Sequence, residues 1–205
     1  MSEEPQAANG SALAPEEAAR ANLYALVGLL FYDAPDSILL AEICGNEAEP
    51  TGEGGAVGEA WAALRAAARS AFPAVLKQEY DTLFVGVGRA EVTPYTSHYL
   101  KDSAPDRHVV RLRDQLSQWG LVRRNAAYEV EDHVSGICDV MRYLILEGRS
   151  EGEQRLFFKE FVYPGVIPFL DAVNAAASPV FYRLVSAFAR AFFEIERAAF
   201  EMQEA

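Results

Sequence analysis

Apolar residues recur three and four positions apart in one segment after another of this 205-residue chain. Such spacing is typical of amphipathic helices, because it places the apolar side chains on one face. Sustained alternation of apolar and polar residues, which would indicate strands, does not occur, and no internal repeat of roughly 20 to 50 residues is present. The sequence therefore predicts an all-α fold. The clearest apolar stripe consists of Leu23, Leu26, Val27, Leu30 and Phe31.

Prolines, glycines and polar clusters divide the chain into segments of helical length. Residues 1–14 are small and polar and lack apolar periodicity, so we expect a mobile N-terminal tail followed by one helical domain over residues 15–205. Pro164 and Pro168 are expected to break the helix that contains them. The helices are expected over residues 15–32, 37–43, 61–72, 75–84, 109–119, 134–146, 151–175 and 179–202, with an ordered loop over residues 85–103. The last helix is expected to bury Val180, Leu184, Val185, Phe188, Phe192 and Ile195.

The chain is acidic, with a formal net charge of −12 at pH 7. Binding to a nucleic-acid backbone requires clustered Lys and Arg, so the composition disfavours nucleic acid as a partner and is compatible with a basic peptide. No apolar run of about 18 residues occurs, and Met1–Glu4 is acidic where a secretory signal would be basic. We therefore expect a cytoplasmic protein without stable membrane insertion. Cys44 and Cys138 are far apart in sequence and indicate reduced thiols.

The segment Glu79–Phe84 combines polar and aromatic residues at helical spacing. Tyr80, Leu83 and Phe84 are three and four positions apart, so one helix face would carry a large apolar surface. Such a surface usually belongs to the core, and spacing alone favours that interpretation. Because proline and aromatic residues follow in the next loop, the alternative is a groove that accepts an apolar peptide segment. The loop residues in question are Pro94, Tyr95, Ser97 and Tyr99.

The acidic segment Tyr128–His133 precedes an amphipathic helix that is expected to start at Val134. Negative side chains are favoured in a first helical turn by its unpaired N–H groups. One hypothesis places Asp132 and His133 in a polar patch beside a groove. The alternative, which spacing alone favours, is that Asp132 caps the helix and that His133 is a hydrogen-bonded boundary residue. The apolar stripe of this helix is expected to consist of Val134, Ile137, Cys138, Met141, Leu144 and Ile145.

Glu129 and His133 are four positions apart and would share a helix face, which raises the question of a metal or acid–base site. Di-iron bundles use Glu-x-x-His pairs, whereas the residue three positions before His133 is Val130. The chain contains no G-x-S-x-G element and no G-K-[ST] phosphate loop. We therefore expect no catalytic residue, no metal and no cofactor. The alternative hypothesis is a helical-bundle enzyme, or a protein that binds a metal or small ligand, using Glu129, Asp132 and His133.

In order and spacing, these segments resemble the TorD, DmsD and NarJ family of chaperones. That family carries a polar-aromatic helix with Leu-Phe, then a loop with proline, an aromatic residue, serine and tyrosine, and then an E-P-x-D-H element that opens a helix. The corresponding segments here are Glu79–Phe84, Pro94–Tyr99 and Glu129–His133, and the likeness covers about residues 18–200. The chain departs from the family pattern at Val130, where the family has proline. A later His-Leu-x-Pro-Trp element appears here only as Phe161–Gly165.

The resemblance implies a single-domain helical bundle that acts as a chaperone and not as an enzyme. Such proteins bind, in the cytoplasm, the precursor of a molybdenum-containing oxidoreductase of the dimethyl sulfoxide reductase family. They recognise its twin-arginine leader peptide or its apo form, assist cofactor insertion before export, and act as monomers or homodimers. A structural subunit that docks on a folded partner without binding a leader is a further hypothesis. Carried over residue by residue, the implied peptide-binding residues are Tyr80, Leu83, Phe84, Pro94, Tyr95, Ser97, Tyr99, Glu129, Asp132 and His133.

Overall fold

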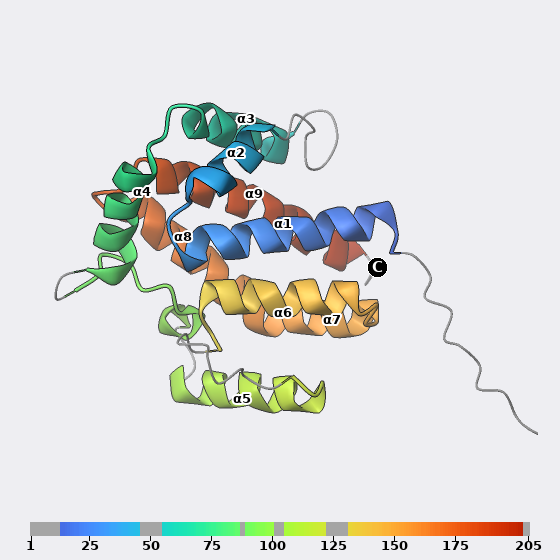
Figure 1. Cartoon of the computed structure of the whole chain (residues 1–205). Coiled ribbons are helices and arrows are strands. Elements are labelled where there is room, and N and C mark those ends of the chain that lie inside the picture. Colours follow the sequence, from blue (N-terminus) through green and yellow to red (C-terminus); the bar gives the residue numbers. More distant parts are fainter. Residues whose placement is uncertain (1–12, 46–54, 87–88, 101–104, 122–130, 203–205) are drawn as a thin grey trace, which may run out of the picture.

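The computed structural model describes residues 13–45, 55–86, 89–100, 105–121 and 131–202, and every regular element in these ranges is helical (Figure 1). The predicted all-α class is confirmed. The expected N-terminal tail lies outside the described residues except for positions 13 and 14. In chain order the elements are α1 (Pro15–Tyr32), α2 (Ser37–Gly45), α3 (Ala56–Ala68), α4 (Pro73–Tyr80), the π-helical turn η1 (Asp81–Val85), the 3₁₀ turn η2 (Thr96–Tyr99), α5 (Pro105–Gln118), α6 (Val134–Leu146), α7 (Glu151–Phe157), the π-helical turn η3 (Phe158–Val162), α8 (Tyr163–Ala175) and α9 (Phe181–Met202).

The helix α1 lies at the centre of the molecule, with α6 along one side and α2 and α3 on the other in Figure 1. Behind it, α9 packs against α3, α8 and α1. The bounds of α1 are those predicted, because Pro15 fits a first helical turn and Asp33 adopts an extended conformation that ends the helix. None of the described helices combines the length and apolar character needed to span a membrane. Of the predicted α1 stripe, the buried residues are Leu23, Val27, Leu30 and Phe31.

The last helix buries only part of the predicted set of residues. Val185, Phe188 and Phe192 are buried as expected, but Val180 precedes α9 and is 75% exposed, and Ile195 is 45% exposed. The face that packs into the core carries every aromatic residue of α9, and their larger apolar area outweighs that of the aliphatic positions. These aromatic residues are Phe181, Tyr182, Phe188, Phe192, Phe193 and Phe200.

Two of the helices contain π-helical turns that apolar spacing does not predict. The helix expected over residues 75–84 begins at Pro73 and continues into the π-helical turn η1. The second π-helical turn, η3, lies just before Pro164, where a break was expected. Because a π turn holds more residues than an α turn, neighbouring residues such as Leu83 and Phe84 both reach the core. Pro164 then occupies the first turn of α8, where its missing N–H costs no hydrogen bond. Pro168 lies within α8 without ending it.

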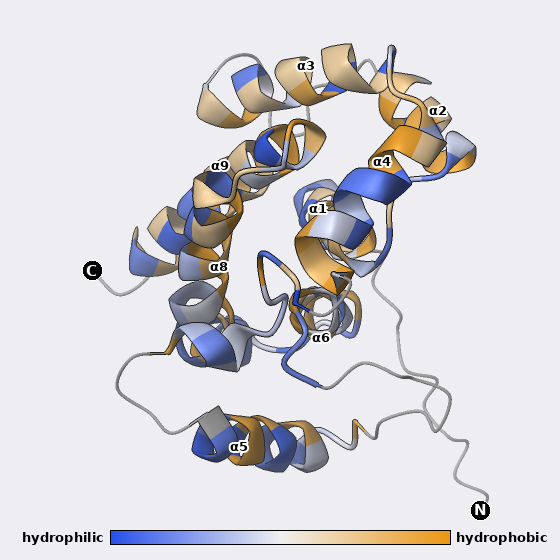
Figure 2. Ribbon diagram, turned by 90° about the vertical axis from the view of Figure 1, so that its left-hand side faces the viewer, coloured by the Kyte–Doolittle hydropathy of each residue, from blue (hydrophilic) through white to orange (hydrophobic). Residues whose placement is uncertain are grey.

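The amphipathic helix α5 lies apart from the other long helices and packs on the molecule through one face (Figure 2). The ring of His108 on this face is 5.4 Å from the ring of Phe161, between centroids, and its Nε2 is buried without a hydrogen-bond partner in the described part of the chain. Burial lowers the pKa of His108; Asp132 and Glu160 oppose this effect, and Arg111 reinforces it. His108 is therefore held neutral in the folded protein. The buried side chains of α5 are His108, Leu112 and Leu116, and Trp119, which directly follows the helix, is buried as well.

A neutral, buried His108 makes stability depend on pH. Above the ordinary histidine pKa of about 6.5, His108 is neutral in the folded and unfolded chains alike and adds no pH dependence. As the pH falls below about 6.5, the unfolded chain binds the proton first, so the free energy of unfolding decreases until the lower pKa of the folded state is passed. We expect His108→Phe to lose less stability than the wild type between about pH 7 and pH 5, measured by urea unfolding. Equal losses in both proteins would contradict a neutral buried histidine.

The start of α8 packs directly on η2. A Cβ added to Gly165 would lie 2.5 Å from Thr96 Cβ and 2.9 Å from Thr96 O, so the two backbones approach this closely only because residue 165 has no side chain. Gly165→Ala is therefore expected to lower the free energy of unfolding by about 1–3 kcal/mol in urea titrations. Gly152 in α7 is the matched control, because a Cβ there meets only Ser150 Oγ at 4.0 Å. Gly152→Ala is expected to raise stability by about 0.5–1 kcal/mol, and similar effects of the two substitutions would rule out the close approach.

Candidate functional site

Tyr80 connects α4 to the end of α1 through hydrogen bonds of its hydroxyl group. Its hydroxyl donates a hydrogen bond to Tyr32 O at 2.7 Å and lies 3.2 Å from Phe31 O. Tyr182 of α9 adds a second donor, with its hydroxyl 3.1 Å from Leu30 O. The last carbonyl groups of a helix have no partner within that helix, so the two tyrosines supply donors that α1 lacks. The Tyr80 side chain, predicted to contact a peptide, is buried in this arrangement.

Glu79, which opens the same segment, caps the start of α9. Its carboxylate accepts hydrogen bonds from the backbone N–H groups of Val180 at 2.9 Å, Phe181 at 3.2 Å and Tyr182 at 2.8 Å. These donors are unpaired at a helix N-terminus, where a negative charge also complements the helix dipole. The segment Glu79–Phe84 therefore joins α4 to both α1 and α9.

Leu83 and Phe84 belong to the core, which is the interpretation that their spacing favoured. Both side chains are buried. The ring of Phe84 lies 5.3 Å from that of Tyr182 and 6.0 Å from those of Phe31 and Phe169, between centroids. These aromatic contacts hold η1 against α1, α8 and α9, and they leave neither side chain on the surface.

The loop with the second predicted segment docks on the start of α6. An isolated antiparallel bridge pairs Tyr95 with His133, and their rings lie 5.4 Å apart between centroids. Loop residues that are far from Asp132 and His133 in sequence thus become their neighbours in space. The two backbone hydrogen bonds of the bridge, each 2.9 Å long, run from Thr96 N–H to Asp132 O and from Val134 N–H to Pro94 O.

Tyr99 closes the same loop. Its hydroxyl donates a hydrogen bond to Thr93 O at 2.7 Å, and its ring lies 6.0 Å from that of Phe169 in α8. Burial disfavours the phenolate and raises the pKa of Tyr99 to about 12. Tyr99 is therefore a hydrogen-bond donor that stabilises the loop and is unsuited to proton transfer near neutral pH.

Asp132 does not cap α6, contrary to the interpretation that spacing favoured. Its buried carboxylate accepts hydrogen bonds from the N–H of Ser97, at 3.2 Å, and from the Ser97 hydroxyl. The N-cap is His133, whose Nδ1 accepts a hydrogen bond from Ser135 N–H at 3.2 Å and lies 2.7 Å from Ser135 Oγ. The reason is a tertiary contact. The Asp132 carboxylate is hydrogen-bonded to Ser97 and therefore does not accept hydrogen bonds from the first N–H groups of α6. Both Asp132 and His133 are buried, so they do not form an exposed polar patch.

A metal centre finds no support among the residues that the structure describes. Within these ranges, no three His, Cys, Asp or Glu side chains are grouped so that they could hold a metal ion. Glu129 and Val130 lie outside the described residues. Cys138 is buried and burial raises the pKa of its thiol, which disfavours the thiolate that a nucleophile requires.

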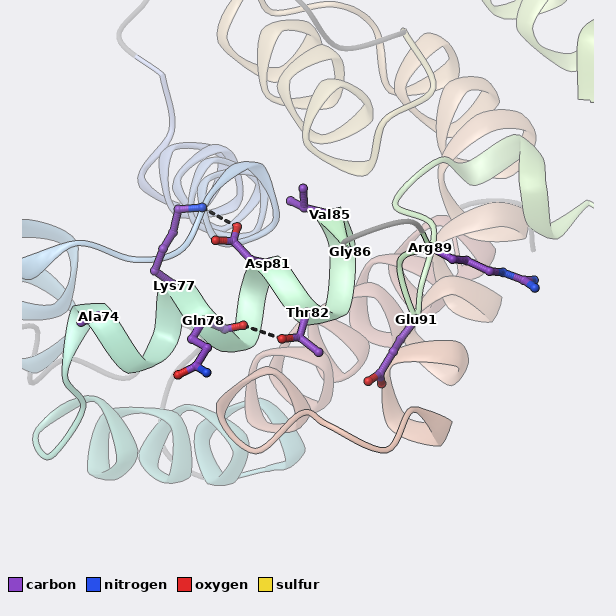
Figure 3. Close-up of a pocket in the computed structure, with 9 residues that line it drawn as sticks. All are labelled: Ala74, Lys77, Gln78, Asp81, Thr82, Val85, Gly86, Arg89 and Glu91. Atoms are coloured by element: carbon purple, nitrogen blue, oxygen red, sulfur yellow. Dashed lines mark hydrogen bonds and ion pairs between the residues drawn. The ribbon is translucent and has the colours of Figure 1, made fainter.

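An open pocket of about 860 Å³ lies on the outer face of the helix formed by α4 and η1, and Figure 3 labels the residues that line it. The sequence pattern pointed only to the inner face of this helix. The signal for the outer face is the pair Lys77 and Asp81, because oppositely charged residues four positions apart mark an exposed helix face. The lining of this pocket is partly polar and partly apolar. It lies on the face of the helix opposite the buried residues Tyr80, Leu83 and Phe84.

The hydrogen bonds between Ser97 and Asp132 are expected to be an energetic link and not only a close contact. Ser97→Ala and Asp132→Asn should each lower the free energy of unfolding by about 1–2 kcal/mol. The double variant should lose less than the sum, with a coupling of roughly 1 kcal/mol in urea unfolding, because each change removes the same interaction. Asp171→Asn is the matched control, since Asp171 is in an exposed ion pair with Arg190, and it should cost less than about 0.5 kcal/mol. Strict additivity of the two losses would show that Asp132 is not held by Ser97.

Comparisons with known proteins agree with this architecture. A family model described as nitrate reductase delta subunit matches residues 52–164, which is more than half of the chain and includes all three motif segments. No curated protein matches significantly. Among solved structures, the chain is similar to a protein from Archaeoglobus fulgidus described as a redox enzyme maturation protein, with 16% sequence identity and a TM-score of 0.51. That match covers 95% of this chain and 99% of the other, and at this identity it shows a shared fold. The predicted resemblance to the TorD, DmsD and NarJ group is confirmed, and the chain belongs to the nitrate reductase delta subunit family.

Proposed function

We propose that this protein is a cytoplasmic chaperone for the maturation of a molybdenum-containing oxidoreductase of the dimethyl sulfoxide reductase family. The observation that carries the proposal is the family match over residues 52–164. In this role the protein binds the precursor of the catalytic subunit, through its twin-arginine leader, its apo form or both, and holds it until the cofactor is inserted before export. The protein acts by binding and not by catalysis, so it stabilises the precursor through mass action.

The charge of the protein suits a basic ligand. With a net charge of −12, the molecule attracts a leader that carries two guanidinium groups, and carboxylates are the natural partners of arginine. An apolar stretch follows the arginines in such a leader and requires an apolar contact surface. The proposed ligand therefore carries both positive charge and an apolar segment, and a surface with carboxylates and apolar side chains can bind both.

The predicted peptide-binding residues contribute to this function mainly by shaping the site. Tyr80, Leu83, Phe84 and Asp132 are buried, so a peptide does not reach them in this structure. Their contacts instead fix the position of the α4–η1 helix, whose outer face lines the open pocket. We assign the direct contacts to that outer face. Glu129 lies outside the described residues and keeps its proposed role as a carboxylate that meets a leader arginine.

Purification of the affinity-tagged protein from its native cell is expected to recover a molybdoenzyme catalytic subunit, identified by mass spectrometry. Because contacts between arginine and exposed carboxylates are screened by salt, binding of that client's leader should weaken as the ionic strength rises from about 0.05 to 0.5 M. The control is the same client without its leader, which separates binding of the leader from binding of the apo form. Recovery of other proteins in the absence of any molybdoenzyme subunit would contradict the proposed function.

A further inference from the structure

The exposed edge of the α4–η1 helix carries a cation between two carboxylates and an aromatic ring. Lys77 Nζ is paired with Asp81, lies 3.9 Å from Asp33 Oδ1, and lies 5.6 Å from the centroid of the Tyr80 ring. Asp33 directly follows α1, so the contact between Tyr80 and the end of α1 brings the two carboxylates together. One ammonium group faces two carboxylates, and the cluster keeps a net negative charge.

Exposed apolar side chains occur on both elements that carry this cluster. In the last turn of α1, Leu29 is 54% exposed and Tyr32 is 58% exposed, beside Asp33. On the helix that carries the cluster, Val85 is 60% exposed and follows Lys77 and Asp81 along the same edge in Figure 3. Both elements that carry the cluster thus leave large apolar side chains exposed to solvent.

The open pocket adjoins this edge and is bounded by a sharp turn. Gly86 has a φ of 64°, which favours glycine, and its N–H donates to Asp81 O at 2.6 Å where η1 ends. After the turn, Glu91 is held at the far side of the pocket, where its carboxylate accepts a hydrogen bond from Ser178 N–H at 3.3 Å. The Arg89 side chain extends away from the pocket in Figure 3. Arg89 also lines the pocket, and Lys77 is the cation that lies between Asp33 and Asp81.

We propose that this surface docks an extended, arginine-containing apolar segment of the client, and that a client guanidinium replaces the Lys77 ammonium between Asp33 and Asp81. The inference rests on the proposed function and adds the contact residues. Leu29, Tyr32 and Val85 contact apolar residues on either side of that arginine. Lys77 serves as an internal substitute for the client's cation and keeps the two carboxylates from repelling each other while the site is free.

The chemistry of the site favours arginine over other occupants. A guanidinium is planar and carries five N–H donors, so it can bond two carboxylates at once, whereas an ammonium acts as a point charge. The ion pair to be broken is half-exposed, and such pairs contribute little stability, so its replacement is easy. An anionic ligand would be repelled by Asp33, Asp81 and Glu91. A second copy of this chain would bring a net charge of −12 against the same acidic edge.

The test is a titration of the full-length protein with a fluorescently labelled peptide that has two consecutive arginines followed by an apolar segment. Lys77→Ala frees both carboxylates and is expected to tighten binding by about threefold. Asp33→Asn combined with Asp81→Asn is expected to weaken binding by about tenfold. The matched control is Arg197→Ala, which removes one positive charge from the exposed Arg197–Glu201 pair on α9 and should leave the affinity unchanged. Replacing the peptide's arginines with lysines should weaken binding to the wild type.

The outcomes separate this inference from the proposed function. A gain of affinity in Lys77→Ala cannot arise from misfolding, so it supports the site directly. If the wild type binds the peptide but neither Lys77→Ala nor the double carboxylate variant changes the affinity, the site is wrong and the proposed function stands. Absence of binding by the wild type overturns this inference. The proposed function falls with it only if purification from the native cell also recovers no molybdoenzyme subunit.

Discussion

A buried carboxylate joins two of the motif segments, the loop Pro94–Tyr99 and the start of α6. Asp132 is buried, and its Oδ2 accepts hydrogen bonds from both the N–H and the hydroxyl of Ser97. A buried polar group without its partner costs about 1–3 kcal/mol, and more when it is charged, so the chain around Ser97 must remain docked on the start of α6. Thr96, which directly precedes Ser97, lies against Gly165 at the start of α8. A single interaction thereby fixes three segments that are distant in sequence.

The two faces of the α4–η1 helix have different physical tasks. Tyr80, Leu83 and Phe84 face inward, where their hydrogen bonds and aromatic contacts attach the helix to α1, α8 and α9. Lys77 and Asp81 face outward, where an exposed ion pair adds little to stability. Substitutions on the inner face therefore change the free energy of unfolding. Substitutions on the outer face leave the fold intact and change the charge of the surface that we propose for client binding.

Local sequence patterns predicted the features that local interactions determine. The bounds of α1 follow from Pro15 and Asp33, and the whole predicted stripe of α6 is buried. The cap of α6 was assigned wrongly to Asp132, because its true partner Ser97 lies 35 positions away and is invisible to helical spacing. The turns η1 and η3 were missed because several apolar residues follow one another there, and their spacing does not reveal a wider turn. The outer face of α4–η1 was overlooked because Asp33 reaches Lys77 only through the packing of α1 on α4.

The departure from the family pattern at Phe161–Gly165 has a structural explanation. In the resemblance, Phe161 stands where the family has histidine and Gly165 where it has tryptophan. Phe161 is buried against His108 of α5, so an aromatic side chain there serves packing and not a polar contact. At position 165 even a Cβ would lie 2.5 Å from Thr96 Cβ, so a tryptophan would force the η2 loop away from α8. Glycine permits the closer approach, and the loop that Ser97 and Asp132 anchor to α6 is held against α8 as well. Glycine at position 165 thus permits the docking of the segment that shapes the proposed binding surface.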